Sequence, residues 1–447
     1  MLGQKQIEDI LKRALRFSKA DETQVILTTQ DLSLTRFANT VIHQNVAETN
    51  VSVTIRAVVG KRTGTASTNN LDDGALAQAT ERALAHARQQ PADPDFPGLA
   101  DPQPIEPAPA FDDATAGFSP QDRATGVGVI CALAADHKFS AAGAFRTAAS
   151  EIGIANSRGV LAYHAGTSAD LQTVVTGEDG TGWAQASSWK AREIDAEAIG
   201  REAVEKAVRA QRPRAIEPGE YAVVVDPYVT DDLLGMLNYT GVSAQAVQEG
   251  RSWMNDRIGQ QAMSVLISIW DDGHDLSGSP LPFDFEGVPK LRVQIVERGV
   301  IGGPVYDLRT ASKEGRETTG HATPPNMRFV SGPLALNLFM APGDSSVEEM
   351  IRSTAKGLYI TRLWYTRPVH PRDCIVTGMT RDGLTLIEKG ELTYPVKNLR
   401  FTQSYLEALA GVQAVSRQQR TLIDEFGGAS RVPALKIEAF NFTGSTV

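Results

Sequence analysis

The sequence contains few of the side chains that build metal sites and disulfide frameworks. Its 447 residues include two cysteines, Cys131 and Cys374, and seven histidines, none of which lies between His164 and His274. Two cysteines so far apart define neither a disulfide framework nor a zinc knuckle. A protein from a reducing compartment fits this composition best.

Positive charge and long apolar runs are also scarce. The 44 Lys and Arg residues face 53 Asp and Glu, a net charge of -9, which opposes a broad grip on phosphate backbones. Nucleic acid is therefore not expected as a direct partner. No apolar run approaches the length of a membrane span, and the N-terminus is polar and amphipathic, unlike a signal peptide. We expect a cytoplasmic protein.

Residues 1–90 are predicted to form an N-terminal α+β domain. Ile7, Ile10 and Leu11 recur at helical spacing and predict an amphipathic helix at its start. Short β-prone segments broken by turn residues follow as a meander. Capping side chains and an apolar repeat of three and four predict a second helix over 75–88. The expected strands are 24–29, 32–38, 41–46 and 51–59.

Residues 91–120 are rich in proline and are expected to form an extended, semi-rigid linker, because each proline ring fixes φ and removes a donor. A middle α+β segment over 121–215 should follow. Asn156-Ser157-Arg158-Gly159 predicts a hairpin turn within it. The other expected elements are helices at 126–136 and 195–211 and strands near 145–156, 160–166 and 168–176.

The last part, 216–447, is predicted to be a large β-rich domain. A buried strand is expected over 221–226, and Pro227 suits the first turn of a helix that reaches about Leu237. Many strands separated by glycine-rich turns follow. The predicted fold class is therefore α+β, with a helix and meander N-terminal domain and a large mixed or antiparallel β-rich C-terminal domain.

Several segments carry a family resemblance through their order and spacing. They are Arg-Phe-Ala-Asn-Thr-Val-Ile-His-Gln-Asn at 36–45, Trp-Asp-Asp-Gly at 270–273, Phe-Glu-Gly at 285–287, Ile-Val-Glu-Arg-Gly-Val at 295–300, Met-Ala-Pro-Gly-Asp to Gly-Leu-Tyr at 340–359, Thr-Gly to Tyr-Pro-Val-Lys at 377–397 and Ala-Phe-Asn-Phe-Thr-Gly-Ser at 439–445. In this order they resemble the TldD/PmbA (TldE) family of metallopeptidases, also called modulators of DNA gyrase. The resemblance extends over nearly the whole chain.

The resemblance implies zinc in only one branch of the family. In TldD, the helix after the first C-terminal strand carries His-Glu-x-x-x-His, and a cysteine near the C-terminus completes the site. Here that helix, 228–241, contains neither histidine nor glutamate, and the tail 426–447 contains no cysteine. This pattern resembles TldE or PmbA, the partner subunit of a heterodimeric peptidase. We expect no catalytic residue, no metal and no cofactor in this chain, with zinc only in a catalytic paralogue.

One glycine-rich loop is a candidate for contact with a peptide or a partner. It contains Thr319, Gly320 and His321, and similar loops in the family border the peptide cleft. Exposed backbone donors and a polar ring there could contact an extended chain. The alternative is a turn with a solvent-facing histidine.

A second candidate lies where the metal helix of the family would be. Asn238, Tyr239 and Thr240 carry an amide and two hydroxyls that could fill the vacated space and contact a ligand. A structural role is the alternative.

Two groups are weak candidates for a displaced metal site. His370 and Cys374 stand four residues apart, but Pro368 and Pro371 argue against a helix, so a surface imidazole and a loop thiol are the alternative. Asp271, Asp272, His274 and Asp275 crowd one turn and could hold a hard metal. A solvated Asp-Gly turn explains the same residues.

Three functional hypotheses follow. The leading one is a non-catalytic subunit that binds peptides or unfolded small proteins and pairs, as a dimer, with a zinc-bearing TldD-like paralogue or with itself. In this case peptidase activity belongs only to the complex. The second hypothesis is a self-sufficient metallopeptidase with a displaced metal site. The third, from the family's other name, is modulation of DNA gyrase through protein contacts.

Overall fold

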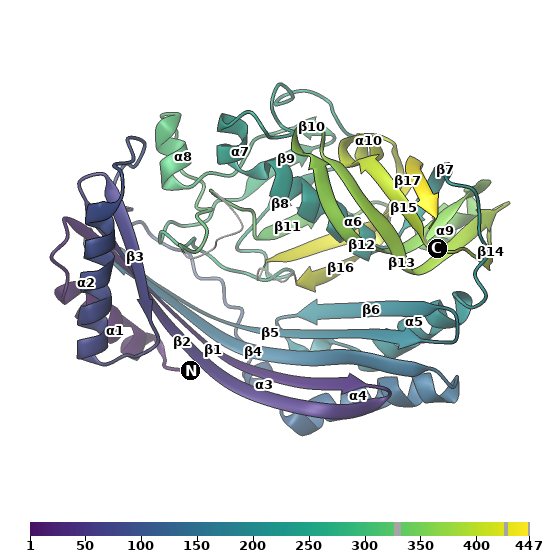
Figure 1. Ribbon diagram of the computed structural model, residues 1–447, viewed down its shortest axis with the longest axis horizontal. Helices are drawn as coiled ribbons and strands as arrows, with labels where there is room; N and C mark the ends of the chain where they lie inside the picture. Colours follow the sequence, from purple (N-terminus) through teal and green to yellow (C-terminus); the bar gives the residue numbers. More distant parts are fainter. Residues whose placement is uncertain (326–331, 424–427, 446–447) are drawn as a thin grey trace.

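The computed structural model describes residues 1–325, 332–423 and 428–445. Two sheets dominate this part of the chain, and Figure 1 shows the second lying over one face of the first. Helices lie on the opposite face of the first sheet. The predicted α+β class, with helices and strands first and a β-rich domain last, is confirmed.

The first sheet has six antiparallel strands and joins both sides of the proline-rich linker. Strand β1 pairs with β2 on one edge and with β4 on the other, so the two segments predicted around the linker share one sheet. The strand order is β3 (Arg62–Thr68), β2 (Val41–Val59), β1 (Glu22–Ala38), β4 (Ser140–Asn156), β5 (Leu161–Thr176) and β6 (Thr181–Ser188).

The strands are longer than the sequence predicts. The segments 24–29 and 32–38 belong to one strand, β1, and 41–46 and 51–59 belong to β2. The two segments expected over 160–176 are likewise one strand, β5. The predicted turn at 156–159 does join β4 to β5.

Helices cover one face of this sheet at both ends. Apolar side chains of α1 and α2 pack on Val25, Leu27 and Ile55, and those of α4 and α5 pack on Phe37 and Phe145. Positions 25, 27 and 37 of β1 share a face because strand side chains alternate. The helices are α1 (Gln4–Arg16), α2 (Asp73–Gln89), the single turn α3 (Asp113–Ala116), α4 (Pro120–Asp136) and α5 (Ala196–Arg209).

The opposite face of the same sheet packs against the C-terminal part. Ile26, Ile152 and Ile154 form a cluster with Phe283 and Val288. The proline-rich stretch also packs here, since Ala100 belongs to this cluster. The stretch is therefore an extended strap that lies on the sheet.

The second sheet contains eleven strands, some of which close into a ring. Strand β7 pairs with both β12 and β17, which closes the path from β17 through β15, β13 and β12. The strands are β7 (Gly219–Val225), β8 (Ile269–Asp271), β9 (Val293–Glu297), β10 (Val300–Ile301), β11 (Asn337–Met340), β12 (Lys356–His370), β13 (Ile375–Glu388), β14 (Glu391–Pro395), β15 (Leu399–Ser404), β16 (Val412–Ile423) and β17 (Ala429–Ser445).

The helices of this half are α6 (Pro227–Leu237), α7 (Ala244–Gln248), α8 (Leu308–Lys313), α9 (Val347–Arg352) and α10 (Tyr405–Ala410). Helix α6 contributes to the largest apolar core of the molecule. Within the described ranges, no helix is long and apolar enough to cross a membrane.

Candidate functional site

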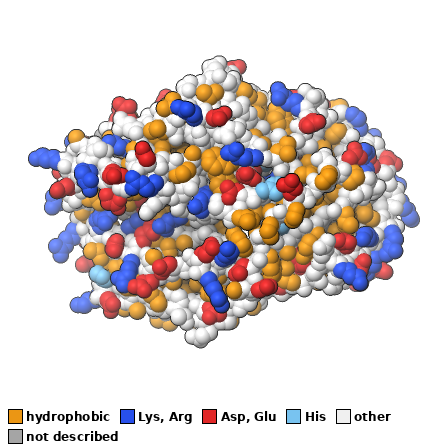
Figure 2. Space-filling view, turned by 180° about the vertical axis from the view of Figure 1, so that it is seen from behind, with side chains coloured by type: hydrophobic (Ala, Val, Ile, Leu, Met, Phe, Trp, Pro, Cys, Tyr) orange, Lys and Arg blue, Asp and Glu red, His pale blue; other side chains and the backbone are white. Residues whose placement is uncertain are grey.

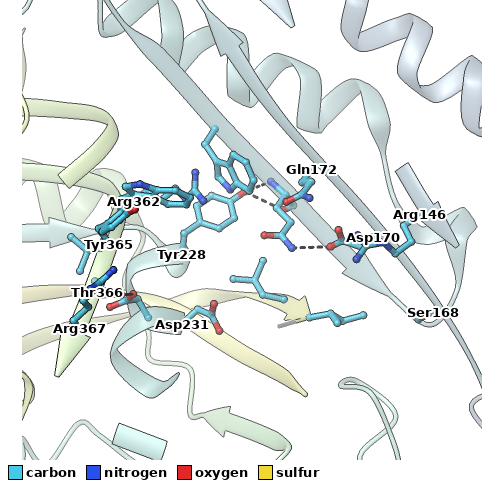
Figure 3. A pocket seen from close by; sticks show the side chains of 17 residues that line it. Arg146, Ser168, Asp170, Gln172, Tyr228, Asp231, Arg362, Tyr365, Thr366 and Arg367 are labelled. Carbon is cyan, nitrogen blue, oxygen red and sulfur yellow. Dashed lines mark hydrogen bonds between the residues drawn. The ribbon is translucent and has the colours of Figure 1, made fainter. Parts of the chain in front are cut away.

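A cleft of about 690 Å³ lies between the two sheets. Figure 3 shows side chains from three directions around it: Arg146 and Asp170 from the first sheet, Tyr228 and Asp231 from α6, and Tyr365 and Arg367 from β12. Segments far apart in the sequence therefore build one site.

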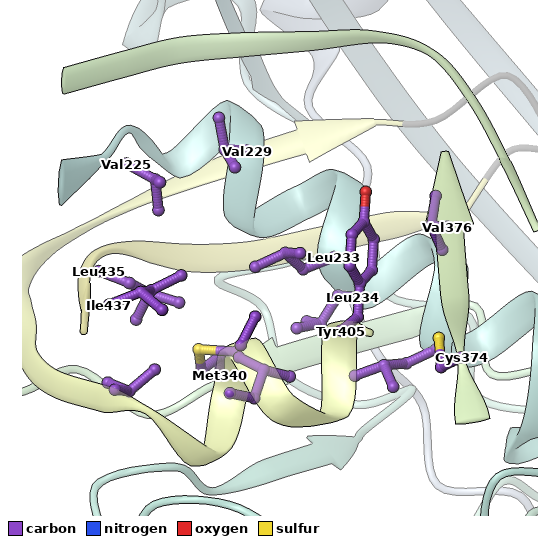
Figure 4. Close-up of a cluster of buried hydrophobic side chains, with 14 of the residues drawn as sticks. Val225, Val229, Leu233, Leu234, Met340, Cys374, Val376, Tyr405, Leu435 and Ile437 are labelled. Atoms are coloured by element: carbon purple, nitrogen blue, oxygen red, sulfur yellow. The ribbon is translucent and has the colours of Figure 1, made fainter. Parts of the chain in front are cut away.

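Helix α6 forms the floor of the cleft because its sequence has two faces. Pro227 occupies the first turn, where its missing N–H is not needed. Val229, Leu233 and Leu234 point into the core, as Figure 4 shows. Positions 228, 231 and 232 follow the three-four spacing of the other face and line the cleft.

Asp232 is bound by two hydroxyls. Thr366 and Tyr405 each donate a hydrogen bond of 2.7 Å to its carboxyl oxygens. Burial raises the pKa of Asp232, and the two hydrogen bonds and the Arg362 charge oppose this shift. The carboxyl is thus held by its neighbours.

The other two cleft residues of α6 also have partners. The Ser430 hydroxyl donates to Asp231 at 2.5 Å. The Tyr228 hydroxyl accepts the backbone N–H of Gln185 at 2.8 Å and also contacts Arg420. Tyr228 thereby joins α6 to strand β6 across the two sheets.

The wall from the first sheet carries another half-buried carboxyl, Asp170. Asp170 accepts hydrogen bonds from Gln185 at 2.8 Å and from Ser187 at 2.7 Å. Burial raises the pKa of Asp170, while these bonds and the nearby Arg146 charge lower it. Arg146 pairs across the strands with Asp170, and its side chain is exposed.

The third wall comes from an irregular part of β12. The pairing with β13 skips from Trp364 to Arg367, so Tyr365 and Thr366 oppose a single residue and form a β-bulge. Tyr365 has a φ of 57°, in the left-handed region, and is 63% exposed. The bulge turns Thr366 toward Asp232 and leaves Tyr365 at the mouth of the cleft.

Below the bulge, the wall is braced by a cation between two rings. The Arg362 guanidinium lies 3.8 Å from the Trp183 ring centre and 4.8 Å from that of Trp364. It also pairs with Asp382 at 2.8 Å. Arg362 thereby links Trp183 of β6 to Trp364 of β12.

The side chains at the floor do not fit a zinc site. Such a site needs three protein ligands that converge from histidine, cysteine or carboxylate. Here α6 offers Asp231 and Asp232, each already hydrogen-bonded. Across the described ranges, no group of three such side chains is arranged to hold a metal ion. Of the tail 426–447, residues 426, 427, 446 and 447 lie outside these ranges.

The predicted residues 238–240 follow α6 but do not line the cleft. Asn238 donates to the carbonyl of Ala335 at 2.7 Å, and Thr240 donates to that of Met236 at 2.6 Å. Both are buried, whereas Tyr239 is 51% exposed. Their amide and hydroxyl groups hold a short π-helical turn, Asn238–Val242.

The alternative given for His321, a solvent-facing ring in a turn, is wrong, and its contact with a peptide or partner stays a prediction. Its side chain is fully buried, and its Nε2 lies 2.9 Å from a carboxyl oxygen of Asp271, which is equally buried. Burial raises the pKa of Asp271, but Lys290 and His321 together hold it below the usual value. Gly320 is buried as well. The Thr319 hydroxyl oxygen lies 2.9 Å from Nδ1 of His321. The loop is a structural anchor in the described chain.

The residues of the two weak metal candidates do not converge on a common point. His370 is exposed and lies 3.0 Å from Asp373, as a surface imidazole would. Cys374 is buried beside Thr240, and burial raises the pKa of its thiol to about 12. Among the acidic group, Asp271 turns inward toward His321, so the reading of a fully solvated turn is wrong for it. Asp272 and Asp275 accept nearby backbone N–H groups at 2.9 Å.

Sequence reasoning missed most of the cleft. Asp170, Tyr228 and Asp232 come from segments whose sequence patterns predict an ordinary strand and a helix. The adjacent Trp364 and Tyr365, flanked by arginines, were the one local signal. Without the register of β12 and β13, nothing placed them at a bulge.

Family models of the PmbA/TldA metallopeptidases match three parts of the chain. The model for domain 1 matches residues 25–87, the central domain matches 115–211, and the C-terminal domain matches 218–444. The last match alone covers half of the sequence.

Individual relatives agree with these models. A Haemophilus influenzae protein named metalloprotease PmbA homolog is 26% identical over 433 residues, 92% of either chain. A metalloprotease of Methanothermobacter thermautotrophicus is 27% identical, but the match spans 51% of this chain and only 49% of that protein. The crystal structure of TldE from Thermococcus kodakarensis shares the fold, with a TM-score of 0.88 at 21% identity over 98% of this chain and all of that one.

Proposed function

Because the chain belongs to the PmbA/TldD metallopeptidase family, we propose that it is a non-catalytic subunit that holds an extended peptide in the cleft and pairs with a zinc-bearing paralogue. One observation carries the proposal. The helix at the cleft floor offers two carboxyls in place of a converging ligand set, and hydroxyls already bind Asp232 from two sides.

The cleft suits a peptide. It is open between two sheets, and its walls combine aromatic rings with hydrogen-bonding side chains. An extended chain presents alternating side chains and free backbone groups, which such a surface can bind with little demand on sequence. The substrate is proposed to be a peptide or an unfolded small protein.

An uncovered strand supports pairing with a second subunit. Strand β1 pairs with β2 along its whole length, but β3 reaches only from Val53 onward. Within the described chain, residues 41–52 of β2 therefore have a strand neighbour on one side only. Exposed edges are usually covered in stable proteins. We propose a dimer with the paralogue, in the cytoplasm, where the free thiols of Cys131 and Cys374 would persist.

Metal content and activity test the proposal together. The purified chain is expected to hold no near-stoichiometric zinc, nickel or manganese and to leave a denatured peptide intact. Addition of a family member that carries His-Glu-x-x-x-His should restore hydrolysis. Chelator-sensitive hydrolysis by the chain alone would overturn the proposal and favour the displaced metal site. The role of a gyrase modulator stays a prediction, which a pull-down with gyrase checks.

A further inference from the structure

The outer face of three neighbouring strands beside the cleft carries an unusual set of side chains. Residues paired across strands point to the same face. Arg362 pairs with Arg381, and Trp364 pairs with Met379, which pairs in turn with Arg400 of β15. These side chains therefore lie on one face of β12, β13 and β15. We name six residues the arginine strip: Trp364, Tyr365, Arg367, Met379, Arg381 and Arg400.

The strip concentrates positive charge. Arg367, Arg381 and Arg400 are exposed, and no Asp or Glu occupies an outward position of the paired stretches 362–369, 375–381 and 400–404. Arg381 lies 3.9 Å from Asp382, whose closer partner is Arg362 at 2.8 Å. Within the described residues, Arg367 and Arg400 form no ion pair.

This concentration contrasts with the net charge of the chain and with the face of the molecule that Figure 2 shows. The chain has a net charge of -9. On the face shown in Figure 2, Lys and Arg are interspersed with Asp and Glu. Neighbouring arginines repel one another, and Arg367 and Arg400 have no acidic partner among the described residues, so the cluster is costly unless an anion neutralises it.

The strip is continuous with the cleft. Trp364, Tyr365 and Arg367 belong to both, and the Arg367 guanidinium lies 5.2 Å from the centre of the Tyr365 ring. Across the cleft, the exposed Arg146 faces the same space from β4. The strained φ of Tyr365 holds an exposed ring where the two surfaces meet, and such strain gathers at binding sites. A chain that leaves the cleft on this side must pass over the strip.

We propose that the arginine strip binds acidic segments of the peptide held in the cleft, so that the subunit selects chains rich in aspartate and glutamate. The inference rests on the proposed function. Arginine binds carboxylates through two parallel hydrogen bonds, and the Trp364 and Tyr365 rings contact the apolar parts of the chain. The three strands span roughly 10 Å, which suits one extended chain. The net charge of -9 opposes a long polyanion such as nucleic acid.

Fluorescence anisotropy with three labelled peptides tests the inference. The peptides have equal length and share aromatic residues, but carry glutamate, glutamine or lysine at the variable positions. The full chain should bind the glutamate peptide about tenfold more tightly than the glutamine peptide, and the preference should shrink with added salt. Equal affinity for the three peptides would overturn the inference and leave the proposed function intact. Binding of none would count against both.

Substitutions in the arginine strip test whether its arginines cause the preference for the glutamate peptide. The double variant Arg367→Gln and Arg400→Gln should lose the preference, so that it binds the glutamate peptide no more tightly than the glutamine peptide. Arg367→Lys with Arg400→Lys should keep only part of the preference, because a lysine ammonium cannot form the two parallel hydrogen bonds that a guanidinium donates to a carboxylate. The control Arg16→Gln with Arg192→Gln removes the same charge from exposed sites elsewhere and should behave as the parent chain. Equal losses in the control, or tighter binding of a single-stranded RNA of equal charge, would refute a peptide-selective strip.

Discussion

The Tyr405 hydroxyl donates a hydrogen bond of 2.7 Å to Asp232 from beneath the floor of the cleft. The two residues are 173 positions apart and join α10 to α6. Tyr405 is fully buried, and burial together with the Asp232 charge raises the pKa of its phenol well above the usual value. The floor is therefore held from the core side as well as from the Thr366 side.

Removal of the Asp232 carboxyl should destabilise the protein. Asp232→Ala leaves the hydroxyls of Tyr405 and Thr366 without their acceptor and is expected to lower the free energy of unfolding by about 1–3 kcal/mol. Asp232→Asn keeps one acceptor oxygen and should lose less. Urea denaturation measures both. Equal losses would mean that side-chain volume, and not the acceptor, matters.

The stability should fall in acid through His164. This ring lies between β5 and the C-terminal part, and burial lowers its pKa from 6.5 to about 4, opposed by a backbone hydrogen bond with Pro280. A lowered histidine pKa means that the folded state disfavours the proton. The contribution of neutral His164 to the free energy of unfolding is fully present above pH 6.5 and is lost as the pH falls toward 4. Between these values the free energy of unfolding changes by at most roughly 1.4 kcal/mol per pH unit through this group.

His164→Gln should remove this part of the slope, as unfolding free energies measured from pH 7.5 to 4 would reveal. His137→Gln, a surface substitution at the end of α4, is the matched control. An unchanged slope in the His164 variant would assign the acid sensitivity to other groups.

Two glycines should respond oppositely to alanine. A Cβ at Gly182 in β6 would lie 2.1 Å from the backbone oxygen of Ala203 in α5, so Gly182→Ala must push the helix from the strand. We expect a loss of about 1–3 kcal/mol. A Cβ at Gly128 in α4 meets nothing within 4 Å, and Gly128→Ala should stabilise the helix by up to about 1 kcal/mol. Thermal unfolding compares the two variants directly.

The Cys374 thiol should be inert in the folded protein. It is fully buried, and burial raises its pKa to about 12, so almost no thiolate forms at pH 8. Mass spectrometry after iodoacetamide treatment should find Cys374 unmodified until urea unfolds the chain. Modification of the native protein at Cys374, or its protection by added zinc, would revive a metal role for this residue.

The elements with strong local periodicity were predictable from the sequence. The apolar spacing in α1 and Pro227 at the start of α6 both mark real helices. Strand lengths were not predictable. Gln30 and Asp31 interrupt the β-prone pattern, yet β1 continues through them because it is paired on both sides. Asp31 accepts the N-terminal amine at 2.5 Å and the Thr49 hydroxyl at 2.7 Å. Tertiary pairing overrides the weak strand preference of aspartate.

The sequence predicts where along the chain the cleft helix lies, but not which other residues line the cleft. The sequence correctly indicated that the helix after β7 lacks histidine and glutamate. It misjudged His321, because the buried acceptor Asp271 lies 50 residues earlier and no local pattern connects them. The bulge at Tyr365 depends on the register with β13, which likewise has no local signature.

The shared first sheet affects how the chain matures on the ribosome. The N–H of Thr23 at the start of β1 binds the hydroxyl of Ser157, which is 134 residues later. At translation rates of about 5–20 residues per second, that interval lasts on the order of ten seconds. During this time the nascent hairpin of β1 and β2 presents an unpaired strand edge to solvent. Chaperones that shield extended segments should therefore raise the yield of folded protein more than they raise its final stability.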